Sequence, residues 1–183
     1  MKIALTGHTS GLGECIYRHF DVDCAFSRSN GYDLLQEHNR VRMLEEIKHC
    51  DVFINNAFPG YAADQTRGMD TQLDILYRVY SQWENQHKLI VHLGSNTTDG
   101  IKSHVWPYAA AKAASDKACE QLSYLKTGPS VCNIRFGYID LPHINAIAPE
   151  EKKIPVATAL NTVQHVIDTF AAGSTVREIT VLP

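Results

Sequence analysis

Apolar residues along the chain fall into short runs and helical stripes that alternate in order. Short apolar runs that end at glycine or polar residues predict strands, which we expect at residues 1–6, 22–26, 51–55, 88–93, 130–136 and 178–182. Apolar residues spaced three or four apart predict helices, which we expect at residues 12–20, 40–50, 70–86, 108–126 and 157–172. Each strand but the last is therefore followed by a helix.

This alternation predicts an α/β fold. Strand–helix–strand units connect through right-handed crossovers, which make the sheet mostly parallel and place helices on both of its faces. We therefore expect a doubly wound sheet in a three-layer α/β/α arrangement. The chain has 183 residues and no repeat, linker or low-complexity tract, so we expect residues 1–183 to form a single domain. Ligands of such sheets bind beyond the carboxyl ends of the strands, where the irregular stretch 138–155 can cover them.

Composition and charge narrow the possible function classes. Hydrophobic residues make up 44% of the chain and charged residues 20%, as in a globular protein with a substantial core. The 17 basic residues against 20 acidic ones give a formal charge of -3 and form no basic run, so we expect no nucleic-acid partner. The N-terminus lacks a signal-peptide pattern, and no run of about 18 apolar residues follows. We therefore expect a cytoplasmic protein that does not bind membranes.

Cysteine and histidine residues give no metal-binding pattern in the sequence. The cysteines are odd in number and scattered, with no C-x-x-C pair and no cysteine–histidine cluster at zinc spacing. They are Cys15, Cys24, Cys50, Cys119 and Cys132. We therefore expect reduced thiols and no metal site.

A glycine-rich segment joins the first expected strand to the first expected helix. It reads Thr6-Gly7-His8-Thr9-Ser10-Gly11-Leu12-Gly13. Gly7 permits a tight turn, Gly11 lets the backbone approach a pyrophosphate, and Gly13 allows close packing of the helix, whose N-terminus faces the anion. Any strand-to-helix turn can contain glycines, but this context favours a dinucleotide-binding turn of the Rossmann type.

The residues after the second expected strand indicate which dinucleotide binds. An acidic residue there would accept hydrogen bonds from a ribose 2′-hydroxyl, whereas an arginine accommodates a 2′-phosphate. This chain has Ser27 and Arg28 at that point and no acid. The sequence therefore favours NADP as the cofactor over NAD.

Four ordered motifs resemble those of the short-chain dehydrogenase/reductase family, and the resemblance covers the whole chain. The first is the spacing T-G-x-x-x-G-x-G, and the second is the segment 51–57, which is similar to the N-N-A-G strand end. Ser95 follows the fourth expected strand, and Tyr108 with Lys112 forms Y-x-x-x-K, 13 positions after the serine. The chain is therefore identified as a small member of this family with trimmed loops.

The Y-x-x-x-K pair also has a physical logic of its own. Residues at i and i+4 share one helix face, so the Lys112 ammonium can lie near the Tyr108 phenol and lower its pKa. Tyr108 then suits general acid/base catalysis near neutral pH, and Ser95 can donate a hydrogen bond to the substrate oxygen. The alternative for each is an ordinary surface residue on an alanine-rich helix.

The resemblance also implies a set of cofactor contacts. Lys112 would hold the nicotinamide ribose, Ile139 would offer its backbone N–H to the carboxamide, and Asp33 would contact adenine unless it merely caps a turn. The full set implied is Thr6, Gly7, Thr9, Ser10, Gly11, Leu12, Gly13, Ser27, Arg28, Asp33, Asn55, Asn56, Ala57, Tyr108, Lys112, Gly137 and Ile139.

The sequence departs from the family pattern at several points. Phe58 replaces the glycine of N-N-A-G, and Ser10 stands where many NADP-binding members carry a basic residue. Asp140 replaces a threonine that often contacts the pyrophosphate. Residues 70–81 lack the asparagine of the family's proton relay, and the nearest polar candidates are Gln72 and Asp74. We also place His104, Trp106 and His143 near the mouth of the site, where each has either a packing or a substrate role.

These observations favour an NADP-dependent oxidoreductase that interconverts a small-molecule carbonyl and a secondary alcohol. Tyr108 would move the proton, Ser95 would stabilise the oxygen, and Lys112 would tune Tyr108. One alternative is a non-catalytic NADP(H)-binding sensor on the same fold. Another is a sugar-nucleotide epimerase or dehydratase, although such enzymes generally need a larger C-terminal domain than this chain has.

The pattern of the two long helices before and after Ser95 predicts an oligomer. Tyr77, Tyr80 and Trp83 form an aromatic stripe that we expect to face solvent, which is costly in a monomer. Alanines dominate the helix that begins near Tyr108 and would let a neighbouring helix approach closely. We therefore expect a homodimer or homotetramer, which is also the family's habit.

Overall fold

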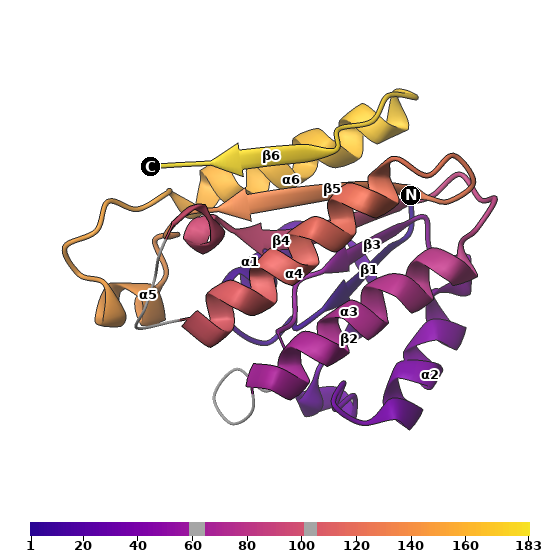
Figure 1. Ribbon diagram of the computed structural model, residues 1–183, viewed down its shortest axis with the longest axis horizontal. Helices are drawn as coiled ribbons and strands as arrows, with labels where there is room; N and C mark the ends of the chain where they lie inside the picture. Colours follow the sequence, from indigo (N-terminus) through magenta and orange to yellow (C-terminus); the bar gives the residue numbers. More distant parts are fainter. Residues whose placement is uncertain (59–64, 101–105) are drawn as a thin grey trace.

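A single parallel sheet organises the protein, as seen in a computed structural model that describes residues 1–58, 65–100 and 106–183. Its strands lie in the order β2-β1-β3-β4-β5-β6, and every neighbouring pair is parallel (Figure 1). They are β1 Ile3–Thr6, β2 Val22–Phe26, β3 Val52–Asn55, β4 Leu89–Ser95, β5 Ser130–Phe136 and β6 Glu178–Val181. The expected doubly wound α/β fold is confirmed.

Helices cover both faces of this sheet. The α-helices of the described residues are α1 Gly11–His19, α2 Glu37–Glu46, α3 Gln65–Gln82, α4 Trp106–Ser123, α5 Pro142–Ile147 and α6 Val156–Ala171. Short 3₁₀ turns are η1 Arg28–Asn30, η2 Ile47–His49 and η3 Asn96–Asp99. The helices α1 and α6 pack on one face, and α2, α3 and α4 pack on the other (Figure 1). The architecture is therefore the expected three-layer α/β/α arrangement.

The central strands are mostly apolar because both of their faces are buried. Successive side chains of a strand point to opposite faces. In β3, Ile54 packs among residues of α1 and α6, whereas Phe53 packs among residues of α2, α3 and α4. Two separate cores result, one on each side of the sheet. Among the described residues, no helix is both long and apolar enough to cross a bilayer.

The structure corrects several expected boundaries. Ser95 is the last residue of β4 rather than a loop residue, and the stretch 138–155 contains α5 and a bridge between Ile139 and Ile154. Helix α3 ends at Gln82, after which Asn85 turns the chain with a φ of 59°. The hydrophobic periodicity predicts a helix as far as residue 86, because periodicity contains no information about a backbone turn.

The aromatic stripe predicted on α3 does not face solvent. Trp83 is fully buried, with its ring edge-on to Phe53 at 6.4 Å, and Tyr80 is only 7% exposed. A side chain at Gly128 would collide with the Tyr80 ring, so this glycine makes room for the tyrosine. Only Tyr77 of the three is exposed. The prediction was wrong because the end of α3 lies against the sheet rather than on the outside of it.

Candidate functional site

The glycine turn after β1 has the compact geometry that the sequence predicts. Gly7 has a φ of 74°, which disfavours any residue with a side chain. A Cβ at Gly13 would lie 2.0 Å from the Gly7 carbonyl oxygen and 2.4 Å from Asn56 Nδ2. Helix α1 can therefore begin directly against the turn. The side chain of Ser10, its N-cap residue, makes no capping hydrogen bond, which leaves the amides of the first turn open to an anion.

The ends of β1 and β3 are held together by side-chain hydrogen bonds. The hydroxyl of Thr6 accepts hydrogen bonds from the backbone amides of Asn56 at 3.1 Å and Ala57 at 3.0 Å. The Asn56 side chain donates to the carbonyls of Thr6 at 3.0 Å and Gly7 at 3.1 Å. These residues, which we predicted to contact the cofactor, thus shape the turn that would receive it.

The late segment of the chain lies over the same turn. A Cβ at Gly11, whose φ is 59°, would lie 3.2 Å from Cε1 of His143 in α5. His143 therefore stands beside the N-terminus of α1. Trp106 is 68% exposed at the start of α4, and His104 lies outside the described residues. Thr9 lies in the glycine turn, and Leu12 lies in the first helical turn of α1.

Lys112 is a buried amine at the carboxyl end of β4. It is 3% exposed, and its Nζ donates a hydrogen bond to the Leu93 carbonyl at 2.9 Å. Burial lowers the pKa of Lys112 to about 8, with Asp116 acting against the shift. Its Nζ lies 5.8 Å from the ring centre of Tyr108, which is half-buried one helical turn earlier. The predicted sharing of one helix face is present.

Ser95 lies at the end of the same strand, with its side chain buried and already engaged. Its Oγ accepts hydrogen bonds from the Thr97 backbone amide at 3.3 Å and from the Thr97 hydroxyl at 3.0 Å. Because both lone pairs of the hydroxyl are used, its own proton remains available for donation. Thr97 has no counterpart in the motif, and only the structure shows that it orients Ser95.

Phe58 contacts both members of the Y-x-x-x-K pair. Its ring is edge-on to Tyr108, with centres 5.4 Å apart and planes at 86°, and the Lys112 Nζ lies 5.5 Å from its centre. The sequence marked Phe58 only as a departure from N-N-A-G. The fold places this aromatic ring against the two residues predicted to do the chemistry.

Of the two polar candidates in α3, only Gln72 reaches this region. It is fully buried, donates to the Ala57 carbonyl at 3.1 Å, and accepts from the Ser115 hydroxyl at 3.0 Å. Asp74 instead pairs with Arg40 and Arg78, each at 2.7 Å. Gln72 therefore links the end of β3 to α4. Asp74 instead links α3 to Arg40 of α2 and to Arg78 in the next turn of α3.

Asn55 and His92 form a buried polar pair between β3 and β4. Asn55 Nδ2 lies 3.3 Å from His92 Nδ1, and both residues are fully buried. Burial, followed by the charge of Lys112, holds the pKa of His92 well below its usual value. His92 is therefore neutral, and the Asn55 side chain faces its neighbour strand rather than open solvent.

The residues predicted to select the cofactor lie just after β2. Arg28 begins η1 and is exposed, and within the described chain its guanidinium makes no hydrogen bond or ion pair. The Ser27 hydroxyl lies 2.7 Å from the Ser29 hydroxyl, and Asp33 Oδ1 accepts from the Leu35 amide at 3.2 Å. The geometry of a turn cap is thus present at Asp33.

Gly137 and Ile139 follow β5. The amide of Gly137 donates to the Val181 carbonyl at 3.0 Å, and Ile139 is buried at its bridge to Ile154. The Asp140 carboxylate accepts from Asn145 at 2.8 Å, which ties it to α5.

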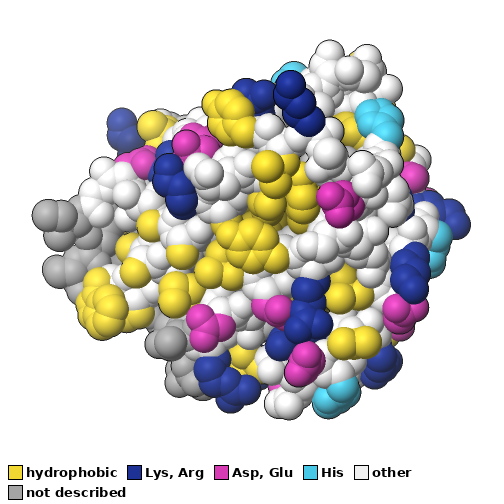
Figure 2. Space-filling model, turned by 45° about the vertical axis from the view of Figure 1, so that its right-hand side comes forward, with side chains coloured by type: hydrophobic (Ala, Val, Ile, Leu, Met, Phe, Trp, Pro, Cys, Tyr) yellow, Lys and Arg dark blue, Asp and Glu magenta, His cyan; other side chains and the backbone are white. Residues whose placement is uncertain are grey.

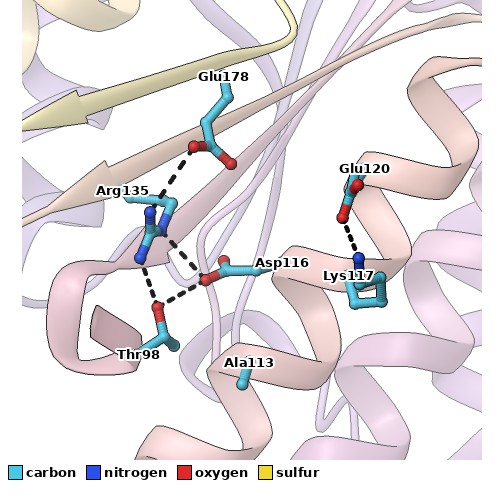
Figure 3. A pocket seen from close by; sticks show the side chains of 7 residues that line it. All are labelled: Thr98, Ala113, Asp116, Lys117, Glu120, Arg135 and Glu178. Carbon is cyan, nitrogen blue, oxygen red and sulfur yellow. Dashed lines mark hydrogen bonds and ion pairs between the residues drawn. The ribbon is translucent and has the colours of Figure 1, made fainter. Parts of the chain in front are cut away.

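An open cavity of about 220 Å³ lies elsewhere, on the outer side of α4 and β5 (Figure 3). Its lining residues are Thr98, Ala113, Asp116, Lys117, Glu120, Arg135 and Glu178. Asp116 accepts from Thr98 at 2.9 Å and from Asn133 at 2.8 Å, and lies 3.2 Å from Arg135 Nε. This network joins α4, one turn after Lys112, to the segment that follows Ser95. It braces the candidate site from outside and contains none of the predicted site residues.

Comparisons with known proteins bear on the fold. No protein-family model matches the sequence, and no curated protein matches it significantly. Solved structures match over nearly the whole chain. The closed form of a serine dehydrogenase complexed with NADP+ has a TM-score of 0.77 at 18% identity, covering 100% of this chain and 95% of that one. A 4-hydroxyisoleucine dehydrogenase complexed with NADH has a TM-score of 0.75 at 18% identity, covering 99% and 96%.

A third match names the family directly. A short chain dehydrogenase from Burkholderia cenocepacia J2315 in complex with NADP has a TM-score of 0.73 at 16% identity, covering 100% of this chain and 90% of that one. The resemblance to short-chain dehydrogenases therefore holds for the fold along the full chain. At such identities the likeness shows the fold alone, so the roles of Ser95, Tyr108 and Lys112 stay predictions.

Proposed function

We propose that this protein is an NADP-dependent oxidoreductase that interconverts a small carbonyl compound and the corresponding secondary alcohol. The observation that carries the proposal is the buried Lys112 ammonium beside Tyr108, at the strand end that also holds Ser95. Burying an amine is costly, and such groups cluster at functional sites. The likeness in fold to NADP- and NADH-bound dehydrogenases supports the same conclusion.

The chain offers a fitting place for a dinucleotide. The open amides at the start of α1 and the side-chain-free surface of Gly7, Gly11 and Gly13 suit a pyrophosphate. Arg28, exposed after β2, suits a 2′-phosphate, which is the basis for favouring NADP. We propose that residues 1–183 act as one NAD(P)-binding domain. The cofactor would supply or accept the hydride.

The chain's own residues would handle the proton and the oxygen. In the reducing direction, Tyr108 gives its phenolic proton to the carbonyl oxygen while the carbonyl carbon receives the hydride, so an alcohol forms. The Lys112 ammonium stabilises the phenolate left behind. Ser95, whose lone pairs are occupied by Thr97, donates its proton in a hydrogen bond to the same oxygen. The reverse direction uses the same groups in the opposite order.

Lys112 has donors to spare for this role. An ammonium group has three N–H donors, of which one is bonded to the Leu93 carbonyl. We propose that the other two donors bind the nicotinamide ribose. With a pKa of about 8, the amine is mostly charged at pH 7. Gln72 supports the arrangement indirectly, because it holds the Ala57 carbonyl beside Phe58.

Phe58 motivates a second candidate function, a sensor that binds NADP(H) without turnover. Its ring packs on both Tyr108 and Lys112, which would restrict the approach of a substrate to the phenol. The two candidates share cofactor binding and differ in hydride transfer.

The test combines direct binding of NADPH with a screen of NADPH oxidation over a panel of aldehydes and ketones. The enzyme proposal expects saturable binding and turnover of at least one carbonyl. Binding with no oxidation across the panel would favour the sensor, and the absence of binding would overturn both. If Phe58→Ala then gave turnover that the parent lacks, Phe58 would be the group that suppresses it.

We propose in addition that the protein is a homodimer or homotetramer. The support is narrower than the sequence suggested, since Tyr80 and Trp83 are buried. Tyr77 remains exposed on α3, and Ala110 and Ala113 are exposed on α4. Hydrophobic side chains form an interrupted band across the face shown in Figure 2. Light scattering at micromolar concentration should give at least twice the chain mass of 20.4 kDa, and a clean monomer that is fully active would refute this.

A further inference from the structure

Three metal-ligating side chains that are scattered in the sequence meet at the edge of the sheet. Cys24 lies on β2, His49 ends η2, and Cys50 follows directly. The Cys24 and Cys50 sulfurs are 3.8 Å apart, and the Cys24 sulfur is 4.0 Å from His49 Nε2. All three ligand atoms lie within 4.8 Å of one another. This group is absent from the site described above.

The spacing suits a tetrahedral centre. With metal–sulfur bonds of about 2.3 Å and metal–nitrogen bonds of about 2.0 Å, two ligating sulfurs lie about 3.8 Å apart, and a sulfur and a nitrogen about 3.5 Å apart. The Cys24–Cys50 distance already matches that requirement. His49 would need to approach the Cys24 sulfur by about half an ångström and the Cys50 sulfur by up to about 1.3 Å, which an exposed side chain can do by rotation. The ligand set of two thiols and one imidazole is typical of Zn²⁺.

Solvent can reach this cluster. Cysteine binds a metal ion as a thiolate, so binding at Cys24 and Cys50 would release protons. The sulfur of Cys24 is half-buried and His49 is exposed, so the ion has a route in from solvent.

The cluster has a defined structural position. Cys50 lies two residues before Val52, where β3 begins, whereas Asn55 ends that strand at the candidate active site. Strand β2, which carries Cys24, is at the edge of the sheet that the described residues form, and it pairs there with β1. An ion held by these side chains would tie the edge strand to the connection between α2 and β3.

We propose that Cys24, His49 and Cys50 form a binding site for a thiophilic divalent cation, Zn²⁺ in the first place, with water as the fourth ligand. We assign the ion a structural role, because Cys50 lies at the end of β3 opposite Asn55 and Cys24 lies on an edge strand. Metal binding to the folded chain alone stabilises it by mass action. The inference is independent of the proposed oxidoreductase function.

Cobalt(II) is the probe for this site, because its thiolate charge-transfer and visible d–d absorption bands report sulfur ligation and tetrahedral geometry without any turnover assay. The full chain is reduced with a non-thiol reductant, freed of metal and titrated with Co²⁺ under anaerobic conditions. We expect one Co²⁺ per chain, displacement of Co²⁺ by Zn²⁺, and a higher Tm with Zn²⁺.

Two variants and one control test which side chains bind the Co²⁺ ion. Cys24→Ser and His49→Ala alter half-buried or exposed positions, and circular dichroism checks that they fold. Loss of a residue that only hydrogen-bonds to a ligand typically weakens metal binding by about 10- to 100-fold. Each of these variants removes a ligand itself, so each should weaken Co²⁺ binding by more than that. Cys15→Ser removes a half-buried thiol outside the cluster and should leave binding unchanged.

Several outcomes would overturn the proposal. They are the absence of charge-transfer bands, bands that persist in Cys24→Ser, and bands lost equally in Cys15→Ser. A Cys24–Cys50 disulfide that survives the reductant and blocks Co²⁺ would also overturn it, since the pair would then be a covalent link rather than a ligand pair.

Discussion

The two ends of the sheet hold two different candidate sites, which the sequence and the structure revealed in different ways. At the carboxyl end, Ser95 ends β4, and Lys112 lies beside Tyr108 on α4. Toward the amino end of β3, Cys24, His49 and Cys50 gather with no motif to announce them. The first group could be predicted from the sequence because Tyr108 and Lys112 are one turn apart on a single helix and Ser95 stands at a fixed spacing before them. The second group is assembled only when β2 and β3 pair with opposite sides of β1.

The strongest test of this contrast is Tyr108→Phe. Removing a general acid/base lowers turnover by about 10²- to 10⁴-fold, while NADPH affinity should stay nearly unchanged because the ring remains. Tyr124→Phe, at an exposed position after α4, is the matched control. Co²⁺ binding at the other end of the sheet should be the same in both variants. Near-parental turnover in Tyr108→Phe would remove the basis for assigning chemistry to the carboxyl end.

Lys112→Met should expose the stability cost of the buried amine. The pKa of Lys112 is lowered from 10.5 to about 8, so between these pH values the unfolded chain binds more protons at this lysine, and stability rises with pH. Below pH 8 the folded protein bears the whole cost, about 3 kcal/mol for such a shift. Loss of the hydrogen bond to Leu93 offsets about 1 kcal/mol.

Urea unfolding at pH 7 should therefore show Lys112→Met to be about 2 kcal/mol more stable than the parent. The difference should shrink as the pH approaches 10.5. Turnover and NADPH binding should both suffer. Lys117→Met, on the exposed side of the same helix, is the control and should show no such trend. A difference that does not depend on pH would mean that Lys112 is not held in a desolvated place.

Arg28→Ala separates the two dinucleotides. Losing a charge-assisted contact to a 2′-phosphate costs about 1.5 to 3 kcal/mol in NADPH affinity, and NADH affinity should hardly change. Isothermal titration of both cofactors measures the gap. Arg18→Ala removes an exposed arginine at the far end of α1 as a control. Equal affinities of the parent for NADPH and NADH would contradict the preference.

Gly13→Ala tests the packing on which the glycine turn depends. The new Cβ would meet the Gly7 carbonyl at 2.0 Å, so the start of α1 must shift, and overpacking of this kind costs about 1 to 3 kcal/mol. NADPH binding should weaken in parallel. A Cβ at Gly100 would meet none of the described residues within 4 Å, so Gly100→Ala should be neutral. Thermal denaturation compares the two variants, and equal Tm values would show that the turn yields more easily than its geometry indicates.

Several features could be predicted because they depend on neighbours along the chain. The parallel sheet with helices on both faces follows from alternating elements and right-handed crossovers. The roles of Gly7 and Gly13 could be predicted because a tight strand-to-helix turn leaves no room for a Cβ at either position. The contact between Lys112 and Tyr108 follows from helical spacing alone.

Other features depended on which face of an element meets the sheet. Periodicity placed Tyr80 and Trp83 on one side of α3, but only packing decided that this side lies inward, against Phe53 and Gly128. The same holds for Gln72 and Asp74, which are two positions apart and serve different partners. A helical stripe shows that a face is apolar or polar, and it carries no information about what covers it.

The sequence by itself determined the fold class, the glycine turn and the Tyr108–Lys112 pair, since each is set by short-range geometry. Only the tertiary structure decided that Phe58 packs on Tyr108 and Lys112, and that the sulfurs of Cys24 and Cys50 lie 3.8 Å apart. These contacts join residues from different elements. Their distances follow from how strands and helices pack around two cores, which short-range spacing does not specify.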